Sequence, residues 1–220
     1  MQNQNSIGEI CRVKDGRAII VAPCPPLQTM KRKEIKRVEV AYLDGRKITP
    51  EQRRKAYAIL GEIARYTGYS IEEAKAQCKM VYCAQTQIAP FSLASMSIDR
   101  ARDFIGFLID WCLEWDIPCR DNLLVYAEDI TRFLYGCLRW RRCIICGRPA
   151  EVHHCDKIGM GRNREHIVHV GLKAESVCRK HHSQAHTMGQ QSFDEYYHVY
   201  GLRLTEELVR ILRLGALPND

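Results

Sequence analysis

The sequence predicts an α+β protein with a β-rich lead, a helical domain, and a small zinc-stabilised module that ends in further helices. Three observations predict it. Apolar residues alternate in the first 48 residues and then recur at helical spacing. All eight histidines lie between His153 and His198, close to paired cysteines. A length of 220 residues allows two small domains, which we place at 1–138 and 139–220.

Composition and charge narrow the class of protein. The hydrophobic fraction of 46% is that of a globular chain, and no run approaches the ~18 apolar residues of a membrane span. The first ten residues lack the basic and apolar regions of a secretory signal, so we expect a cytoplasmic protein with reduced thiols. The formal charge of +7 suits a polyanionic partner.

The lead is predicted to be β-rich from residue 6 to residue 48. Lys14-Asp15-Gly16 separates two apolar runs, which indicates a hairpin, and residues 38–42 alternate as a further strand. Between them, residues 31–37 hold five basic side chains. This run is either a solvated loop or a phosphate contact.

Helical spacing begins at Thr49, where Thr49-Pro50-Glu51-Gln52 forms a helix start with a capping residue and an early proline. A second helix is predicted over 71–82. Ser97 caps a third helix, which Pro118 ends. The apolar spacing then predicts a fourth helix over 121–140.

Two pairs of metal-ligand residues stand 31 residues apart. Cys143 and Cys146 form a Cys-x2-Cys knuckle followed by Gly147, and Cys178 and His181 form a second pair at the same spacing. Four such ligands suit tetrahedral zinc. The alternative is that these are buried, reduced thiols without a metal.

Four further histidines lie near these pairs. His182 and His186 share a helix face if a helix begins near Cys178, while His153 and His154 follow each other in a predicted strand and point to opposite sides. One of the strand pair can therefore join His182 and His186 around a second metal, leaving the other as a general base. The alternative is one larger structural zinc cluster.

The C-terminal region reads as two short helices. Ser192-Phe193-Asp194-Glu195 has the pattern of a capping box that opens a helix to about Tyr200, and Thr205 caps the last helix. His198, among tyrosines, is interpreted as a packed or surface residue rather than a ligand.

The segment from Cys143 to His186 resembles the HNH (ββα-metal) endonuclease family, with two knuckles around a His-His pair and a final His-x3-His. The resemblance implies an HNH nuclease domain over 139–220. It assigns His154 as the base that activates water, and His153, His182 and His186 as ligands of one divalent ion (Mg²⁺, Mn²⁺, Ni²⁺ or Zn²⁺). The structural Zn²⁺ is a separate cofactor.

The chain departs from the family pattern at one position. The Asn that orients the base usually lies about nine residues before the helical His, and that position holds Lys173 here. Asn163 and His169 are the two candidates to replace it. Arg162, Arg164 and Lys173 are candidate nucleic-acid contacts, and a solvated loop explains the two arginines equally well.

The whole chain resembles HNH nucleases of tailed bacteriophages, and its first half is similar to NinB-type phage recombination proteins, through residues 49–54. The resemblance implies single-stranded or branched DNA as a partner. Single-strand-binding or recombination proteins are further candidate partners, and a homo-oligomer is a further candidate assembly. Arg53, Arg54 and Lys55 suit either phosphate contact or a solvated helix face.

The function predicted from the sequence is metal-dependent DNA hydrolysis in bacteriophage recombination or replication. The alternative is a non-catalytic, zinc-containing DNA-binding recombination mediator with the same fold. An RNA nuclease is a third reading of the same residues.

Overall fold

The computed structural model describes residues 8–32, 34, 45–156 and 168–215, and the chain divides into two compact units, Met1–Asp44 and Gly45–Asp220. The regular elements among the described residues are helices and two small sheets, so the α+β class is confirmed. No helix among these residues is long and apolar enough to cross a membrane.

The first unit contains the predicted hairpin. Strands β1 (Glu9–Lys14) and β2 (Arg17–Val21) pair antiparallel, with a register shift between Ile10 and Arg12. Asp15 and Gly16 connect them with φ values of 50° and 71°, the left-handed backbone that a two-residue hairpin turn requires.

The segment that follows the hairpin differs from the prediction. A short helix, α1 (Leu27–Arg32), begins after Pro25-Pro26 and takes the first two residues of the basic run into its last turn. Most of that run, and the strand predicted over 38–42, lie outside the described residues.

Three long helices open the second unit: α2 (Pro50–Thr67), α3 (Ile71–Thr86) and α4 (Ile98–Glu114). The predicted starts are confirmed, because Thr49, Ser70 and Ser97 each accept a hydrogen bond from a backbone N–H of the first turn. Helix α2 packs on α3 and α4, and its apolar stripe is buried. The core of this layer is formed by Ile59, Leu60, Ile63, Phe104, Ile105 and Leu108.

The single helix predicted over 121–140 is wrong. A 3-10 turn, η1 (Leu123–Tyr126), is separated from helix α5 (Ile130–Arg139) by a break at residues 127–129. Asp129 caps α5, and Glu128 turns away to accept hydrogen bonds from Gln52 and Lys55 of α2. Tertiary bonds from the break therefore outweigh the local helical spacing.

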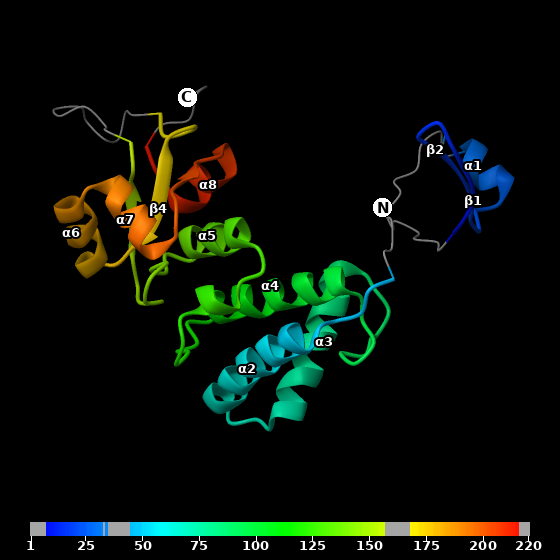
Figure 1. The fold of residues 1–220 in the computed structure, drawn as a ribbon, viewed down its shortest axis with the longest axis horizontal. Helices are drawn as coiled ribbons and strands as arrows, with labels where there is room; N and C mark the ends of the chain where they lie inside the picture. The colour runs from blue at the N-terminus through cyan, green and yellow to red at the C-terminus, as the bar shows by residue number, and fades with distance from the viewer. Residues whose placement is uncertain (1–7, 33, 35–44, 157–167, 216–220) are drawn as a thin grey trace. The chain divides into compact units, whose positions relative to one another are not determined.

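The C-terminal part of this unit is built around a three-stranded antiparallel sheet in the order β3 (Glu151–His154), β4 (Lys173–Val177) and β5 (Leu202–Arg203). Helix α5 packs on β4, and α6 (Arg179–Met188) follows β4 directly. In Figure 1, α6 and α7 (Gln190–Tyr197) lie on one side of β4, and α5 and α8 (Glu206–Leu212) on the other.

Two details of the C-terminal helices bear on the predictions. Thr205 caps α8 as predicted. The capping box at Ser192 is wrong, because α7 begins earlier, at Gln190, after Gly189 with a φ of 82°. The helix ends at Tyr197, and His198 is an exposed residue with a φ of 55°.

The helical layer and the C-terminal part share one hydrophobic core, in which Phe104, Ile144 and Phe193 are fully buried. A smaller cluster around Leu138, Ala174 and Leu208 fills the space between α5, β4 and α8. The boundary expected at 138/139 falls within α5. The division into 1–138 and 139–220 stays a proposal about where each role resides.

Close packing at Gly201 gives a testable consequence. A Cβ added at Gly201, which precedes β5, would overlap the Sγ of Cys155, the residue that follows β3. We expect Gly201→Ala to lower the free energy of unfolding by about 1–3 kcal/mol through overpacking. Cys155→Ala in the same chain should restore most of the loss, because only the sulfur clashes. Denaturant unfolding of the single and double variants measures this, and an equal loss in both contradicts it.

Candidate metal centres and active site

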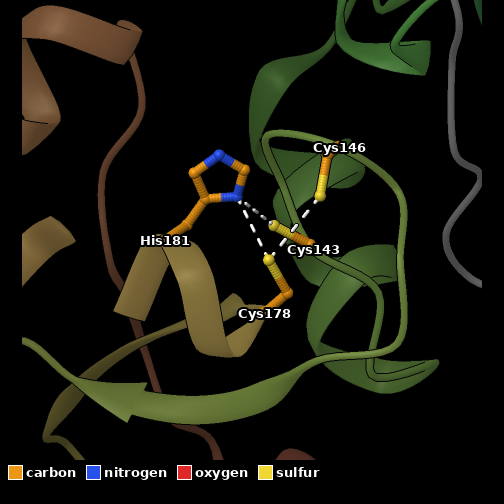
Figure 2. A group of neighbouring side chains, drawn as sticks. All are labelled: Cys143, Cys146, Cys178 and His181. Atoms are coloured by element: carbon orange, nitrogen blue, oxygen red, sulfur yellow. Dashed lines mark hydrogen bonds between the residues drawn. The ribbon is translucent and has the colours of Figure 1, made fainter. Parts of the chain in front are cut away.

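The first cluster joins two segments that lie far apart in sequence. Cys143 and Cys146 lie in the knuckle between α5 and β3, and Cys178 and His181 lie at the start of α6 (Figure 2). The knuckle is closed by two short backbone bonds, from Gly147 N–H to Cys143 O and from Cys143 N–H to Arg148 O, each 2.8 Å. Gly147 has a φ of 68°, so the turn relies on glycine.

The distances in this cluster fit a tetrahedral metal. The ligand atoms of its four residues lie within 4.8 Å of one another. The Cys146 and Cys178 sulfurs are 3.7 Å apart, and zinc–sulfur bonds of about 2.3 Å place tetrahedral sulfurs about 3.8 Å apart. His181 Nδ1 lies 3.3 Å from the Cys143 sulfur and 3.2 Å from the Cys178 sulfur. Three thiols and one imidazole converging in this way fit zinc.

The electrostatics of the cluster also favour a cation. Burial raises the pKa of the Cys143 thiol to about 12, so this residue alone would stay protonated. At Cys178 burial opposes ionisation, but backbone N–H groups at the start of α6 and the neighbouring thiols hold the pKa below its ordinary value. A bound divalent cation would balance thiolates that this buried site otherwise disfavours.

The second cluster gathers three imidazoles. His153 from β3 lies with its ring centroid 4.5 Å from that of His182 and 5.0 Å from that of His186, and the two helical rings are 4.8 Å apart. One ligand nitrogen from each lies within 4.8 Å of the others. The spacing of four along α6 places both helical rings on one face, as the sequence predicts.

The imidazoles of this cluster suit a divalent ion. Burial lowers the pKa of His153, which is 6% exposed, and this keeps its ring neutral as a metal ligand must be. His182 Nδ1 lies 3.4 Å from a carboxylate oxygen of Glu151 on β3. A carboxylate at one ring nitrogen is the usual support for a metal-binding histidine.

His154 is held apart from the three imidazoles by the alternation of β3. Its Nε2 lies 2.9 Å from Nδ1 of His169, and the two rings are 4.9 Å apart. His169 is 3% exposed and lies shortly before β4. Of the two residues considered as substitutes for the family Asn, His169 therefore contacts His154, and Asn163 lies outside the described residues.

The candidate nucleic-acid contacts are only partly described. Arg162 and Arg164 lie outside the described residues. Lys173 is exposed at the first position of β4 and pairs in register with Arg203 of β5. Its backbone N–H donates to Asp156, and its side chain is exposed.

Sequence reasoning missed a polar group behind His153. Its Nε2 lies 2.9 Å from Oε1 of Gln190, the first residue of α7, whose amide nitrogen contacts Glu175 and Asp194. The signal available in the sequence was Glu175, an acid set among the small or apolar residues Ala174, Ser176 and Val177 of β4. In the register of the sheet it pairs with His153.

The site consists of two antiparallel strands followed by a helix, and histidines of the strand and the helix converge on one point. This arrangement defines the ββα-metal class. The chain belongs to the family described as "Putative HNHc nuclease", whose model matches residues 25–215. No curated protein and no solved structure matches the chain. The match to this family supports a nuclease, and the matched residues include the helical layer and both candidate metal clusters.

Proposed function

We propose that the protein is a metal-dependent HNH endonuclease that hydrolyses DNA phosphodiester bonds. The observation that carries the proposal is the separation on β3. His153 lies with His182 and His186 in one cluster, while His154 lies on the other side of the strand against His169. A metal site and, on the next residue of the same strand, an imidazole outside the ligand set are the two parts that hydrolysis by an activated water requires.

The roles follow from this placement. Cys143, Cys146, Cys178 and His181 would hold a structural zinc, and His153, His182 and His186 a divalent ion of the Mg²⁺, Mn²⁺, Ni²⁺ or Zn²⁺ type. When bound, that ion would supply a positive charge against the phosphate oxygens as negative charge develops there.

His154 would act as the general base that takes a proton from the attacking water. At hydrogen-bond distance one ring nitrogen must donate and the other accept, so the contact with His169 favours one tautomer of each ring. His169 thereby orients His154, the role that the resemblance gives to Asn. His154 is half-buried at the last position of β3, against the buried His169.

The charge of the module supports a nucleic acid as substrate. Residues 139–181 contain ten Lys and Arg against four Asp and Glu. Lys173, Lys180 and Arg203 are exposed in this part of the chain. Such cations bind the phosphate backbone without reading base sequence. A role in bacteriophage recombination or replication is part of the proposal and rests on the resemblance of residues 49–54.

The test of the function is incubation of the purified protein with supercoiled plasmid and Mg²⁺, Mn²⁺ or Ni²⁺ in turn. Nicked or linear plasmid supports the proposal. DNA that is bound but never cut supports the non-catalytic mediator instead, and cleavage of RNA alone would make the protein a ribonuclease.

The two-cluster arrangement predicts which ion each variant loses. His182→Ala should weaken binding of the exchangeable divalent ion about 100-fold or more, because one of three ligands is lost, and it should leave one tightly held zinc per chain. Elemental analysis and calorimetric titration of the ion measure both. His198→Asn, which changes an exposed imidazole outside both clusters, is the control. Loss of zinc together with the second ion in His182→Ala contradicts two separate sites.

A further inference from the structure

We infer that Gln190 is a positioning residue that holds His153 with its proton on Nε2, so that Nδ1 is the nitrogen offered to the metal. The inference rests on the proposed metal site of His153, His182 and His186. Gln190 belongs to α7, so a helix outside the ββα motif would help to determine the geometry of this metal site.

The Gln190 amide is oriented by two acids. Its nitrogen lies 3.2 Å from Oε1 of Glu175 and 2.7 Å from Oδ1 of Asp194. Carboxylate oxygens accept hydrogen bonds, and only the NH₂ end of an amide can donate two. The nitrogen therefore faces the two acids, and the amide oxygen must face the opposite way.

The oriented amide fixes the tautomer of His153. The amide oxygen lies 2.9 Å from Nε2 of His153, and an amide oxygen can only accept. Nε2 must therefore carry the proton. A neutral imidazole with its proton on Nε2 has its lone pair on Nδ1, so the proton and the metal-binding nitrogen are assigned by one hydrogen bond.

Burial protects the hydrogen bond between His153 and Gln190 from competition by water. His153 is 6% exposed and Glu175 is 1% exposed, so water is poorly placed to replace the amide. Glu175 is the cross-strand partner of His153, and Asp194 lies one turn after Gln190 on α7, so sheet and helix hold the amide from two directions. The second oxygen of Glu175 has no hydrogen-bond partner among the described residues. Among the described residues, the Gln190 amide is therefore the one hydrogen-bond partner of this buried side chain.

The neighbouring residue offers a matched control. Gln191 is exposed on the same helix and also bonds to an acid four residues on, Glu195, at 2.9 Å. Gln191 has the same side chain as Gln190, lies beside it in the first turn of α7, and makes the same kind of hydrogen bond to an acid four residues on. It has no contact with an imidazole in the described residues, so a change there tests loss of an amide alone.

The experiment measures the tautomer directly by nitrogen-15 NMR of the histidine rings in protein that holds its zinc but no second ion. Recording at about pH 8 keeps Glu175 ionised, since burial raises its pKa to about 7. We expect a protonated Nε2 on His153 in the wild type and in Gln191→Leu. In Gln190→Leu we expect a mixture of tautomers and a divalent-ion affinity about 10–100-fold lower, the usual effect of losing such a support.

A conservative variant separates positioning from packing. Gln190→Glu keeps an oxygen that can accept from His153, so it should retain the protonated Nε2 even if the extra charge lowers stability. A protonated Nδ1 in the wild type, an unchanged tautomer in Gln190→Leu, or the Gln190→Leu pattern in Gln190→Glu would each overturn the inference. Zinc content reports folding in every variant. If no second ion binds, the proposed function fails while the tautomer result stands by itself.

Discussion

Replacement of His154 by alanine is expected to reduce DNA cleavage by about 10²–10⁴-fold, the usual contribution of a general base. The reason is its position, because β3 directs His154 to His169 and away from the three clustered imidazoles. Zinc content, binding of the second ion and DNA affinity should therefore stay close to wild type. Single-turnover cleavage of plasmid, with ion and DNA binding measured on the same preparation, checks this.

The control for His154→Ala is His198→Asn, which alters an exposed imidazole at a left-handed position that Asn tolerates. It should cleave at the wild-type rate. If His154→Ala also cleaves at the wild-type rate, His154 is not the base. If it loses the second ion, the separation of roles on β3 is incorrect.

Replacement of Cys143 by alanine is expected to have the largest effect on stability. Its sulfur is buried among the other three ligand residues, and binding free energies of structural zinc in small peptides are about 10–16 kcal/mol. Each kcal/mol lost lowers the melting temperature of a domain of this size by about 2–4 °C. We therefore expect loss of the zinc and a fall of more than ~10 °C, measured by elemental analysis and calorimetry.

Cys137 provides the matched control, because it is also a fully buried cysteine but lies on α5 outside the metal cluster. Cys137→Ala should keep one zinc per chain and lose only about 1 kcal/mol, as for a small cavity. Equal effects of Cys137→Ala and Cys143→Ala would show that Cys143 serves packing rather than metal binding.

Local patterns predicted much of this molecule. The capping residues Thr49, Ser97 and Thr205 were found because the hydrogen bonds they make lie within one turn. The Cys and His cluster is predicted by the Cys-x2-Cys knuckle and a second pair at the same spacing. The three-histidine cluster is predicted because strand alternation and the helical spacing of four are local rules that fix which side chains can meet. Residues 143–186 therefore contain most of the information for the proposed site.

What the sequence could not show depends on contacts between distant segments. The break before α5 follows from the bonds of Glu128 to Gln52 and Lys55 of α2, which lie more than 70 residues earlier. The early start of α7 accompanies the contact of Gln190 with β3 and β4. The pairing of His154 with His169 depends on how the chain returns to β4, which spacing does not specify.

If the three-histidine site makes this chain a nuclease, cleavage of DNA must depend on the ion bound there, and cleavage followed during a metal titration measures that dependence. Protein that already holds one zinc per chain is stripped of exchangeable ions, and Mn²⁺ is added stepwise while plasmid cleavage and ion binding are followed together. We predict that cleavage rises in proportion to occupancy of the second site. Full occupancy of that site, with zinc in place and no cleavage of DNA, would contradict it.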